Sequence, residues 1–337
     1  MKGAAHLYLG VDGGGTKTAL VLIDSEGTIR ATHLAPGSYY LTIGLDALGA
    51  LLLDGVNAVL AKADVRAEEL DFAFFGLPAY GEDTALVGPL SDLPRRGLAA
   101  GQYLCGNDMI CGWAGSLLCR DGISIVAGTG SICYGERKGA IARCGGWGEL
   151  FSDEGSAYWM ACRGLNLFSR MSDGRAARGP LYDLVRQRLG LTEDLDLCAH
   201  VFSRLQGDRA RIAQLSRWVT EAAAAGDADA MTIVRDAAGE LALMVDATRR
   251  QLAFGAAEPV AVSYSGGVFD NAGALLLEHF AAALQAFRPG YRVSEPALPP
   301  GIGAALYAAK RHGSPLSNAA IERLRARSGA VGAQLDS

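Results

Sequence analysis

A glycine-rich segment near the N-terminus has the residue types needed to hold phosphate groups. It reads Gly-Val-Asp-Gly-Gly-Gly-Thr-Lys-Thr over residues 10–18 and lies between two apolar runs, which predicts a strand, a tight turn and a second strand. Successive glycines, here Gly13, Gly14 and Gly15, leave backbone N–H groups unshielded, and a row of such groups can bind an anion. Thr16 adds a hydroxyl, Lys17 adds a positive charge, and the carboxylate of Asp12 can hold Mg²⁺ directly or through water.

The spacing of this loop differs from that of two well-known phosphate loops. A Walker A loop and a dinucleotide-binding fingerprint both open a helix, whereas here the chain continues into a second apolar run that ends at the turn signal Asp-Ser-Glu-Gly, residues 24–27. The alternative interpretation is an ordinary glycine-rich hairpin, and the loop taken alone does not decide between the two.

Asn107 and Asp108 stand at the end of a short predicted strand, directly before a predicted helix. A carboxylate in such a place can accept the proton of a substrate hydroxyl as that hydroxyl attacks phosphorus. The alternative is that Asp108 only caps the helix that begins at Met109, and from this pair alone the cap is the better interpretation.

Three further segments are rich in glycine and polar groups. A second phosphate-type loop is formed by Gly128, Thr129, Gly130 and Ser131. Residues 144–156, Cys-Gly-Gly-Trp-Gly-Glu-Leu-Phe-Ser-Asp-Glu-Gly-Ser, offer bare backbone and carboxylates that suit sugar hydroxyls, or else a glycine loop before an acidic helix N-terminus. Residues 265–269, Ser-Gly-Gly-Val-Phe, would let the backbone approach a flat purine closely, or else form a plain strand-to-helix turn.

The elements that position these segments form two similar halves. We expect strands at 7–12, 18–24, 28–34, 71–76 and 102–105, with helices at 44–62 and 109–118. The pattern then restarts with strands at 123–127 and 132–136, mainly helices over 153–252, a strand at 260–265 and helices at about 272–286 and 302–312. Each half therefore opens with a hairpin that carries a glycine loop, and the alternative is one large α/β domain.

Composition narrows the class of protein. The chain has 337 residues, a net charge of −5 and no basic run of the kind that binds nucleic acid, so we expect no nucleic-acid partner. No apolar stretch is long enough for a membrane span, and residues 1–6 run straight into the first strand, so we expect no membrane association, no signal peptide and a cytoplasmic location. The seven cysteines include no Cys-x-x-Cys pair, which argues against structural zinc or a disulfide framework and predicts that most of them are buried.

The order of the segments is more specific than any one of them. Glycine hairpin, aspartate, second glycine hairpin, acidic glycine loop and Gly-Gly before a helix follow one another in the order that resembles the N-acetylglucosamine kinase branch of the actin-like ATPase superfamily, in the group that includes BadF/BadG-type ATPases. The resemblance covers essentially the whole chain. Its most specific part is Gly-Gly-Trp-Gly at 145–148 followed by Asp-Glu-Gly-Ser-Ala-Tyr-Trp at 153–159, which is similar to the sugar-site signature of that family.

The resemblance implies an α/β fold of two RNase H-like (actin-like ATPase) domains with the active site in a cleft between them, cleft closure on sugar binding, and a homodimer. The first domain would cover residues 1–118, with a C-terminal helix at about 310–337 packed back on it, and the second would cover 119–309 with a helical insertion. The cofactors would be ATP and Mg²⁺, and the substrate an amino sugar, N-acetylglucosamine before glucosamine, phosphorylated on its 6-hydroxyl.

The same resemblance assigns roles to single residues. Asp108 would be the catalytic base, and Asp12 would hold Mg²⁺. The nucleotide would be bound by Gly13, Gly14, Gly15, Thr16, Lys17, Gly128, Thr129, Gly130, Ser265, Gly266 and Gly267, with Thr16 and Thr129 on its phosphates. The sugar would be contacted by Tyr39, Asn107, Gly145, Gly146 and Asp153.

Two departures from the family pattern flank the expected sugar pocket. Relatives often carry an asparagine in the loop after the third strand, where this chain has Pro-Gly-Ser-Tyr-Tyr at 36–40 with Tyr39 as the nearest match. The loop after the strand at 71–76 is usually built of small residues, but here it reads Leu-Pro-Ala-Tyr-Gly at 77–81. These changes bear on the identity of the hexose rather than on the kinase chemistry.

Two functions of other classes share this scaffold. An ATPase activator of a dehydratase would carry cluster-binding cysteines beside an Ala-Ala-Gly-Thr-Gly segment, and that segment does not occur in this sequence. A non-catalytic sugar sensor would add a helix-turn-helix domain, which we do not expect here. We therefore interpret the sequence as that of an ATP-dependent amino-sugar kinase.

Overall fold

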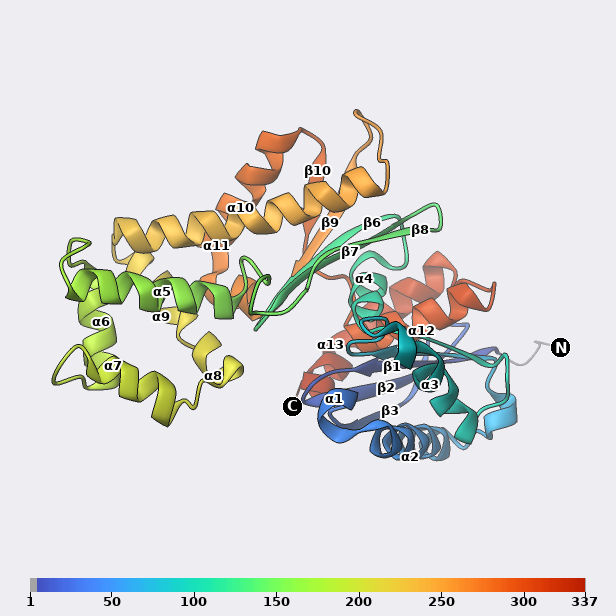
Figure 1. The fold of residues 1–337 in the computed structure, drawn as a ribbon. Helices are drawn as coiled ribbons and strands as arrows, with labels where there is room; N and C mark the ends of the chain where they lie inside the picture. The colour runs from blue at the N-terminus through green and yellow to red at the C-terminus, as the bar shows by residue number, and fades with distance from the viewer. Residues whose placement is uncertain (1–4, 337) are drawn as a thin grey trace. The chain divides into compact units, whose positions relative to one another are not determined.

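The computed structural model describes residues 5–336, which divide into two compact units (Figure 1). The first unit comprises the chain up to Arg120 together with the segment from Pro296 onward, and the second comprises Asp121–Glu295. The chain returns to the first unit at Pro296, earlier than the return near residue 310 that we expected from the sequence. The reason is that the helix α12, Pro300–Arg311, packs on the first sheet rather than on the second.

The first unit is built around a mixed sheet with the strand order β3-β2-β1-β4-β5. Strand β1 pairs antiparallel with β2 and parallel with β4, so the glycine hairpin stands at the centre of the sheet. The strands are β1 Leu7–Gly13, β2 Lys17–Asp24, β3 Ile29–Pro36, β4 Phe72–Leu77 and β5 Tyr103–Asn107. Each corresponds to a strand that the sequence predicts.

Helices cover both faces of this sheet, because the side chains of β1 alternate between two apolar layers. Leu9 and Val11 pack in one cluster with α2, Leu45–Ala63, while Gly10 faces α12 so closely that a Cβ atom would overlap the backbone of that helix. Helix α4, Met109–Leu117, packs against α12 on the same side. The remaining helices of the unit are α1 Tyr40–Ile43, α3 Val87–Asp92, α13 Asn318–Asp336 and the single turns Ala67–Glu69, Thr84–Leu86 and Leu93–Arg96.

The second unit repeats the topology of the first. Its sheet has the order β10-β9-β6-β7-β8, in which β6 is antiparallel to β7 and parallel to β9. The strands are β6 Gly122–Ala127, β7 Ser131–Arg137, β8 Ala140–Gly145, β9 Val260–Ser265 and β10 Tyr291–Ser294. If β6 to β10 are numbered one to five, both sheets have the order three-two-one-four-five, as expected of two RNase H-like domains.

Long helices cover one face of the second sheet, and shorter ones form the insertion. Helix α10 packs on β6, β7 and β8, and α11 packs on α10 (Figure 1). Helix α11 begins earlier than the predicted residue 272, and a left-handed Gly273 kinks it at the point where the sequence pattern becomes regular. The helices are α5 Ala157–Ser172, α6 Pro180–Leu189, α7 Asp196–Ala199, the π-helical turn His200–Arg204, α8 Arg209–Ala213, α9 Ser216–Ala224, α10 Ala228–Gln251 and α11 Gly267–Phe287.

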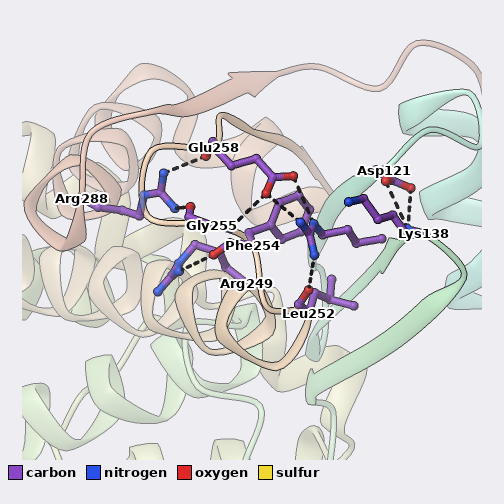
Figure 2. Close-up of polar contacts among 9 residues, drawn as sticks. Asp121, Lys138, Arg249, Leu252, Phe254, Gly255, Glu258 and Arg288 are labelled. Atoms are coloured by element: carbon purple, nitrogen blue, oxygen red, sulfur yellow. Dashed lines mark hydrogen bonds and ion pairs between the residues drawn. The ribbon is translucent and has the colours of Figure 1, made fainter.

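A polar network fixes the loop that leads from α10 to β9 (Figure 2). Arg137 binds both carboxylate oxygens of Glu258 at 3.1 and 2.8 Å and donates to the carbonyl of Leu252 at 3.3 Å. Arg288 donates to the carbonyls of Gly255 and Glu258 at 3.0 and 2.7 Å. These bonds satisfy backbone groups that neither helix nor sheet could satisfy, and they give this loop a structural role.

The seven cysteines differ in exposure. Three are buried (Cys105, Cys111 and Cys133), two are half-buried (Cys119 and Cys144) and two are exposed (Cys162 and Cys198). The prediction that most of them are buried is therefore wrong.

Among the residues that the structure describes, none of the helices combines the length and the apolar character required to cross a membrane.

Candidate active site

Two carboxylates lie close together where β1 and β5 end in the first unit. Asp12 is the next-to-last residue of β1, and Asp108 follows β5 directly. Burial, helped by the nearby negative charge of Asp108, raises the pKa of Asp12 to about 7, and the thiol of Cys111 and the charge of Lys17 oppose this only in part. Two negative charges held together in this way repel each other unless a cation or a proton lies near them.

Close packing at Gly76 is what lets the two carboxylates approach. A Cβ atom at this position of β4 would overlap the Cys111 sulfur of α4 and would lie 3.2 Å from the Asp108 Cα and 3.3 Å from the carbonyl oxygen of Val11. Only glycine therefore allows the start of α4 to pack against the ends of β1 and β4.

Asn107, rather than Asp108, caps helix α4. Its Oδ1 accepts the backbone N–H of Met109 at 3.1 Å, and its Nδ2 donates to the carbonyl of Tyr80 at 3.2 Å. Within the described residues, the side chain of Asp108 makes no capping hydrogen bond to the helix. The capping role that we considered for Asp108 therefore belongs to Asn107. The sugar contact expected of Asn107 stays a prediction.

The first glycine loop presents its tip to solvent while its base is fixed. Gly15, Thr16 and Lys17 are exposed. The base is held by a bond from the backbone N–H of Ser38 to the carbonyl of Gly14 at 2.9 Å. The loop therefore combines an exposed tip with a backbone tied to the segment after β3, which is an arrangement suited to an anion.

The two departures from the family pattern lie near each other in the first unit. Tyr39 is half-buried against the apolar core, and its ring centroid is 6.3 Å from that of Tyr40. Burial raises the pKa of Tyr40, and the charges of Asp83 and Glu82, in the loop after β4, raise it further. Both unusual loops thus border the same part of this unit.

The second glycine loop is joined to the N-terminus of α5. Backbone N–H groups of Ala157 and Tyr158 donate to the carbonyls of Gly128 and Thr129 at 2.9 and 3.3 Å, and the Ser131 hydroxyl donates to the carbonyl of Glu154 at 2.7 Å. Residues 144–156, which we call the acidic loop, are therefore held against the glycine loop, and Thr129 at the tip is exposed.

Asp153 of the acidic loop is buried and ion-paired. Asp153 is only 3% exposed, and its backbone is left-handed with φ of 61°, which is unusual for a residue other than glycine. Its Oδ2 accepts a hydrogen bond from the Nη2 of Arg209, the first residue of α8. The pKa of Asp153 is raised by burial, and the charge of Arg209 is the largest effect that opposes the increase.

The remaining predicted residues of the second unit lie beside these loops. Gly145 and Gly146 both have left-handed backbones, and their carbonyls accept from the Arg143 side chain. A Cβ atom on Gly266 would lie 2.5 Å from the carbonyl oxygen of Ala127, so the turn of Ser265–Gly267 adjoins the end of β6, directly before Gly128.

Comparison with known proteins assigns the chain to a family. The model of the BadF/BadG/BcrA/BcrD ATPase family matches residues 9–308. The chain belongs to this family. The match spans both sheets and every loop described above.

The chain is also similar to two kinases of known name. It is 27% identical to an N-acetyl-D-glucosamine kinase of Dictyostelium discoideum over 90% of this chain and 98% of that protein. It is 29% identical to an N-acetylmuramic acid/N-acetylglucosamine kinase of Clostridium acetobutylicum over 78% of this chain and 85% of that protein. A crystal structure from Chromobacterium violaceum, of a protein provisionally named N-acetylglucosamine kinase, shares the fold with a TM-score of 0.66 at 24% identity and covers 89% of this chain and 98% of that one.

Two arginines that contact the candidate site residues were not predicted from the sequence. Arg143 is one residue before the acidic loop but carries no pattern that marks it, and Arg209 lies 56 residues after its partner Asp153, in the helical insertion. No spacing rule connects two such positions, because only the packing of α8 brings them together. Asn107 could have been recognised as the cap, since asparagine is as good a cap as aspartate.

Proposed function

We propose that this protein is an ATP-dependent kinase that transfers the γ-phosphoryl group to the 6-hydroxyl of N-acetylglucosamine. Membership of the family and the names of the two curated relatives support the reaction and the class of sugar. The observation that carries the proposal is the placement of Asp108. It lies beside Asp12 at the base of the first glycine loop, and the capping work of its position is done by Asn107.

In the proposed reaction Asp108 accepts the proton of the attacking 6-hydroxyl and orients that oxygen toward phosphorus. The exposed N–H groups of Gly15 and Thr16, with Lys17, bind phosphate oxygens, as do the groups of Gly128–Gly130 in the second unit. The acidic loop binds the sugar through Asp153 and the backbone of Gly145 and Gly146. Ser265–Gly267 lies against the adenosine.

The carboxylates of the first unit fit a magnesium ion. Asp12 and Asp108 offer only oxygen donors, and the described residues contain no larger cluster of His, Cys, Asp or Glu that could hold a metal by protein ligands alone. Mg²⁺ usually binds through one or two carboxylates and the phosphates of its nucleotide. When bound at Asp12 it would neutralise charge on the phosphates, and its own charge would relieve the repulsion between the two carboxylates.

We also propose that the enzyme is cytoplasmic and acts as a homodimer.

Glucosamine is the second candidate acceptor, because Tyr39 occupies the position where relatives often carry an asparagine that contacts the sugar. A coupled assay of ADP release should compare N-acetylglucosamine, glucosamine, N-acetylmuramic acid, N-acetylmannosamine and glucose. We expect the highest kcat/KM with N-acetylglucosamine. Equal ADP release with and without every sugar would reject the kinase, and an oxygen-sensitive brown protein would favour the iron–sulfur activator instead.

A further inference from the structure

Arg209 is ion-paired with the acidic loop of the second unit at the point where that loop meets the second glycine loop. Its Nη2 donates to Asp153 Oδ2, and its Nε lies 3.3 Å from Glu149 Oε2. A Cβ atom on Gly130 would overlap both the Arg209 guanidinium and the Asp153 carboxylate. The ion pair therefore lies directly on the second glycine loop, with Asp153 almost fully covered and the Arg209 side chain 38% exposed.

We propose that Arg209 is a positioning residue: it keeps the buried Asp153 carboxylate charged and directed toward the acceptor sugar. This inference rests on the proposed function, because it takes the sugar to be the ligand of Asp153. Arg209 itself acts through Asp153 and need not touch the sugar.

The surroundings of Asp153 explain why it needs a cation. A carboxylate that is removed from water is protonated more readily, and a protonated carboxyl accepts hydrogen bonds from hydroxyls less well. The charged groups that face it are Arg209 on α8 and Glu149 in its own loop, and the backbone N–H groups of Ser131 and Gly148 also donate to it. Glu149 opposes ionisation, so Arg209 is the charge that favours it.

Arg209 also restrains the direction of the Asp153 carboxylate, because it binds one oxygen of that carboxylate. The planar guanidinium fixes the carboxylate by a directed bond, which the compact ammonium of lysine cannot copy fully. Loss of charge and loss of geometry can therefore be separated with two substitutions.

Arg209→Gln removes both the positive charge and the planar guanidinium, whereas Arg209→Lys removes the guanidinium and keeps the charge. We expect Arg209→Gln to lower kcat/KM for N-acetylglucosamine roughly tenfold to hundredfold, as for a lost hydrogen bond to a charged group. The acidic limb of its pH profile should move to a pH higher by about one or more, because an opposite charge has been removed from a carboxylate. Arg209→Lys should restore the acidic limb but only part of kcat/KM.

The matched control is Arg211→Gln, which changes an exposed arginine of the same short helix and should leave both quantities unchanged. A double-mutant cycle with Asp153→Asn decides whether Arg209 acts through Asp153. In the Asp153→Asn background, Arg209→Gln should lower kcat/KM little further. The thermal unfolding midpoints of all variants show whether they are folded.

Three results would overturn the inference. They are an unchanged pH profile in folded Arg209→Gln, a full and independent loss on top of Asp153→Asn, and a loss confined to the acidic sugar N-acetylmuramic acid, which would make Arg209 a direct reader of its carboxylate. If the unmodified enzyme phosphorylates none of the sugars, the proposed function fails first, so the two failures are distinguishable.

Discussion

At the level of single residues, Asn107 and Asp108 are neighbours in the chain with different surroundings. Asn107 has both polar ends of its side chain bonded, to Met109 and to the carbonyl of Tyr80. Asp108 lies beside Asp12 and makes no capping bond within the described part of the chain. One neighbour should therefore matter for stability and the other for turnover.

Asp108→Asn should lower kcat by roughly a hundredfold or more, because the amide keeps the shape of the side chain but cannot accept the proton. Affinity for ATP and the unfolding midpoint should barely change. Asn107→Ala should instead lower the free energy of unfolding by about 1 kcal/mol, as for other lost caps. Steady-state kinetics and thermal unfolding of both variants check this, and near-normal turnover of Asp108→Asn would contradict the assigned role.

The hydroxyl of Thr16 is predicted to bind a phosphate of ATP. Thr16→Val keeps the volume and removes the donor, and should weaken the ATP step by about 1–3 kcal/mol. Thr18→Val is the matched control two positions along the chain, because its buried hydroxyl donates to the carbonyl of Pro36 at 2.9 Å and should affect stability only. The KM for ATP and kcat at saturating sugar are the measurements; if Thr16→Val leaves both unaltered, Thr16 is not a phosphate ligand.

Tyr39 is predicted to tune the choice of sugar rather than the rate. Tyr39→Asn introduces the asparagine that the family resemblance leads us to expect at this position, and it should change the ratio of kcat/KM between N-acetylglucosamine and glucosamine more than it changes the larger of the two values. Asp153→Ala should differ, with a loss of roughly a hundredfold or more for both sugars, because unpaired hydroxyls in a site built to bind them are costly. An unchanged ratio in Tyr39→Asn would show that the loop after β3 does not set specificity.

At the scale of elements, local patterns predicted the central hairpins well. The segment from Leu7 to Asp24 has an apolar run on each side of three glycines and leads into a turn signal. Strands β1 and β2 form there, as expected. Strands β8 and β10 were missed, because Ala140–Gly145 contains an arginine and a glycine and Tyr291–Ser294 is only four residues long, so both depend on pairing with a neighbouring strand. The start of α11 was missed because Gly273 breaks the helical pattern near the predicted start.

The contact between α10 and β10 gives a prediction on pH and stability. Asp246 is buried, and although burial opposes its ionisation, hydrogen bonds from Tyr291 at 2.6 Å and Arg249 at 2.8 Å hold its pKa below the usual value. A carboxylate with a lowered folded pKa stabilises the protein at neutral pH, and this contribution is lost as the pH falls through that lowered value.

Asp246→Asn should therefore lower the free energy of unfolding by about 2 kcal/mol at pH 7, and the difference from the unmodified protein should shrink as the pH approaches 3. Asp173→Asn is the control, because its ion pair with Arg175 is exposed and should contribute little at any pH. Thermal unfolding at several pH values gives the answer, and a difference that grows toward acid would contradict the assigned sign.

At the scale of the whole molecule, the sequence predicted more of the fold than of the site. Two sheets of the same order follow from two strand–glycine–strand units, and the family match spans both. The order of motifs singled out Asp12, Asp108 and Asp153 as candidates, which stay predictions, but the packing of α8 that brings Arg209 to Asp153 has no local signature. The return of the chain at Pro296 was equally hidden, because it depends on α12 meeting Gly10 of β1.

The central claim is that the γ-phosphoryl group of ATP goes to the 6-hydroxyl of N-acetylglucosamine. Phosphorus NMR of the complete reaction mixture tests this directly, because a phosphomonoester at that position couples to the two protons on C6. We expect one new phosphomonoester, coupled to the C6 protons and formed in the same amount as ADP. Inorganic phosphate formed with ADP in place of a sugar phosphate, or a phosphate coupled to the C1 proton, would contradict it.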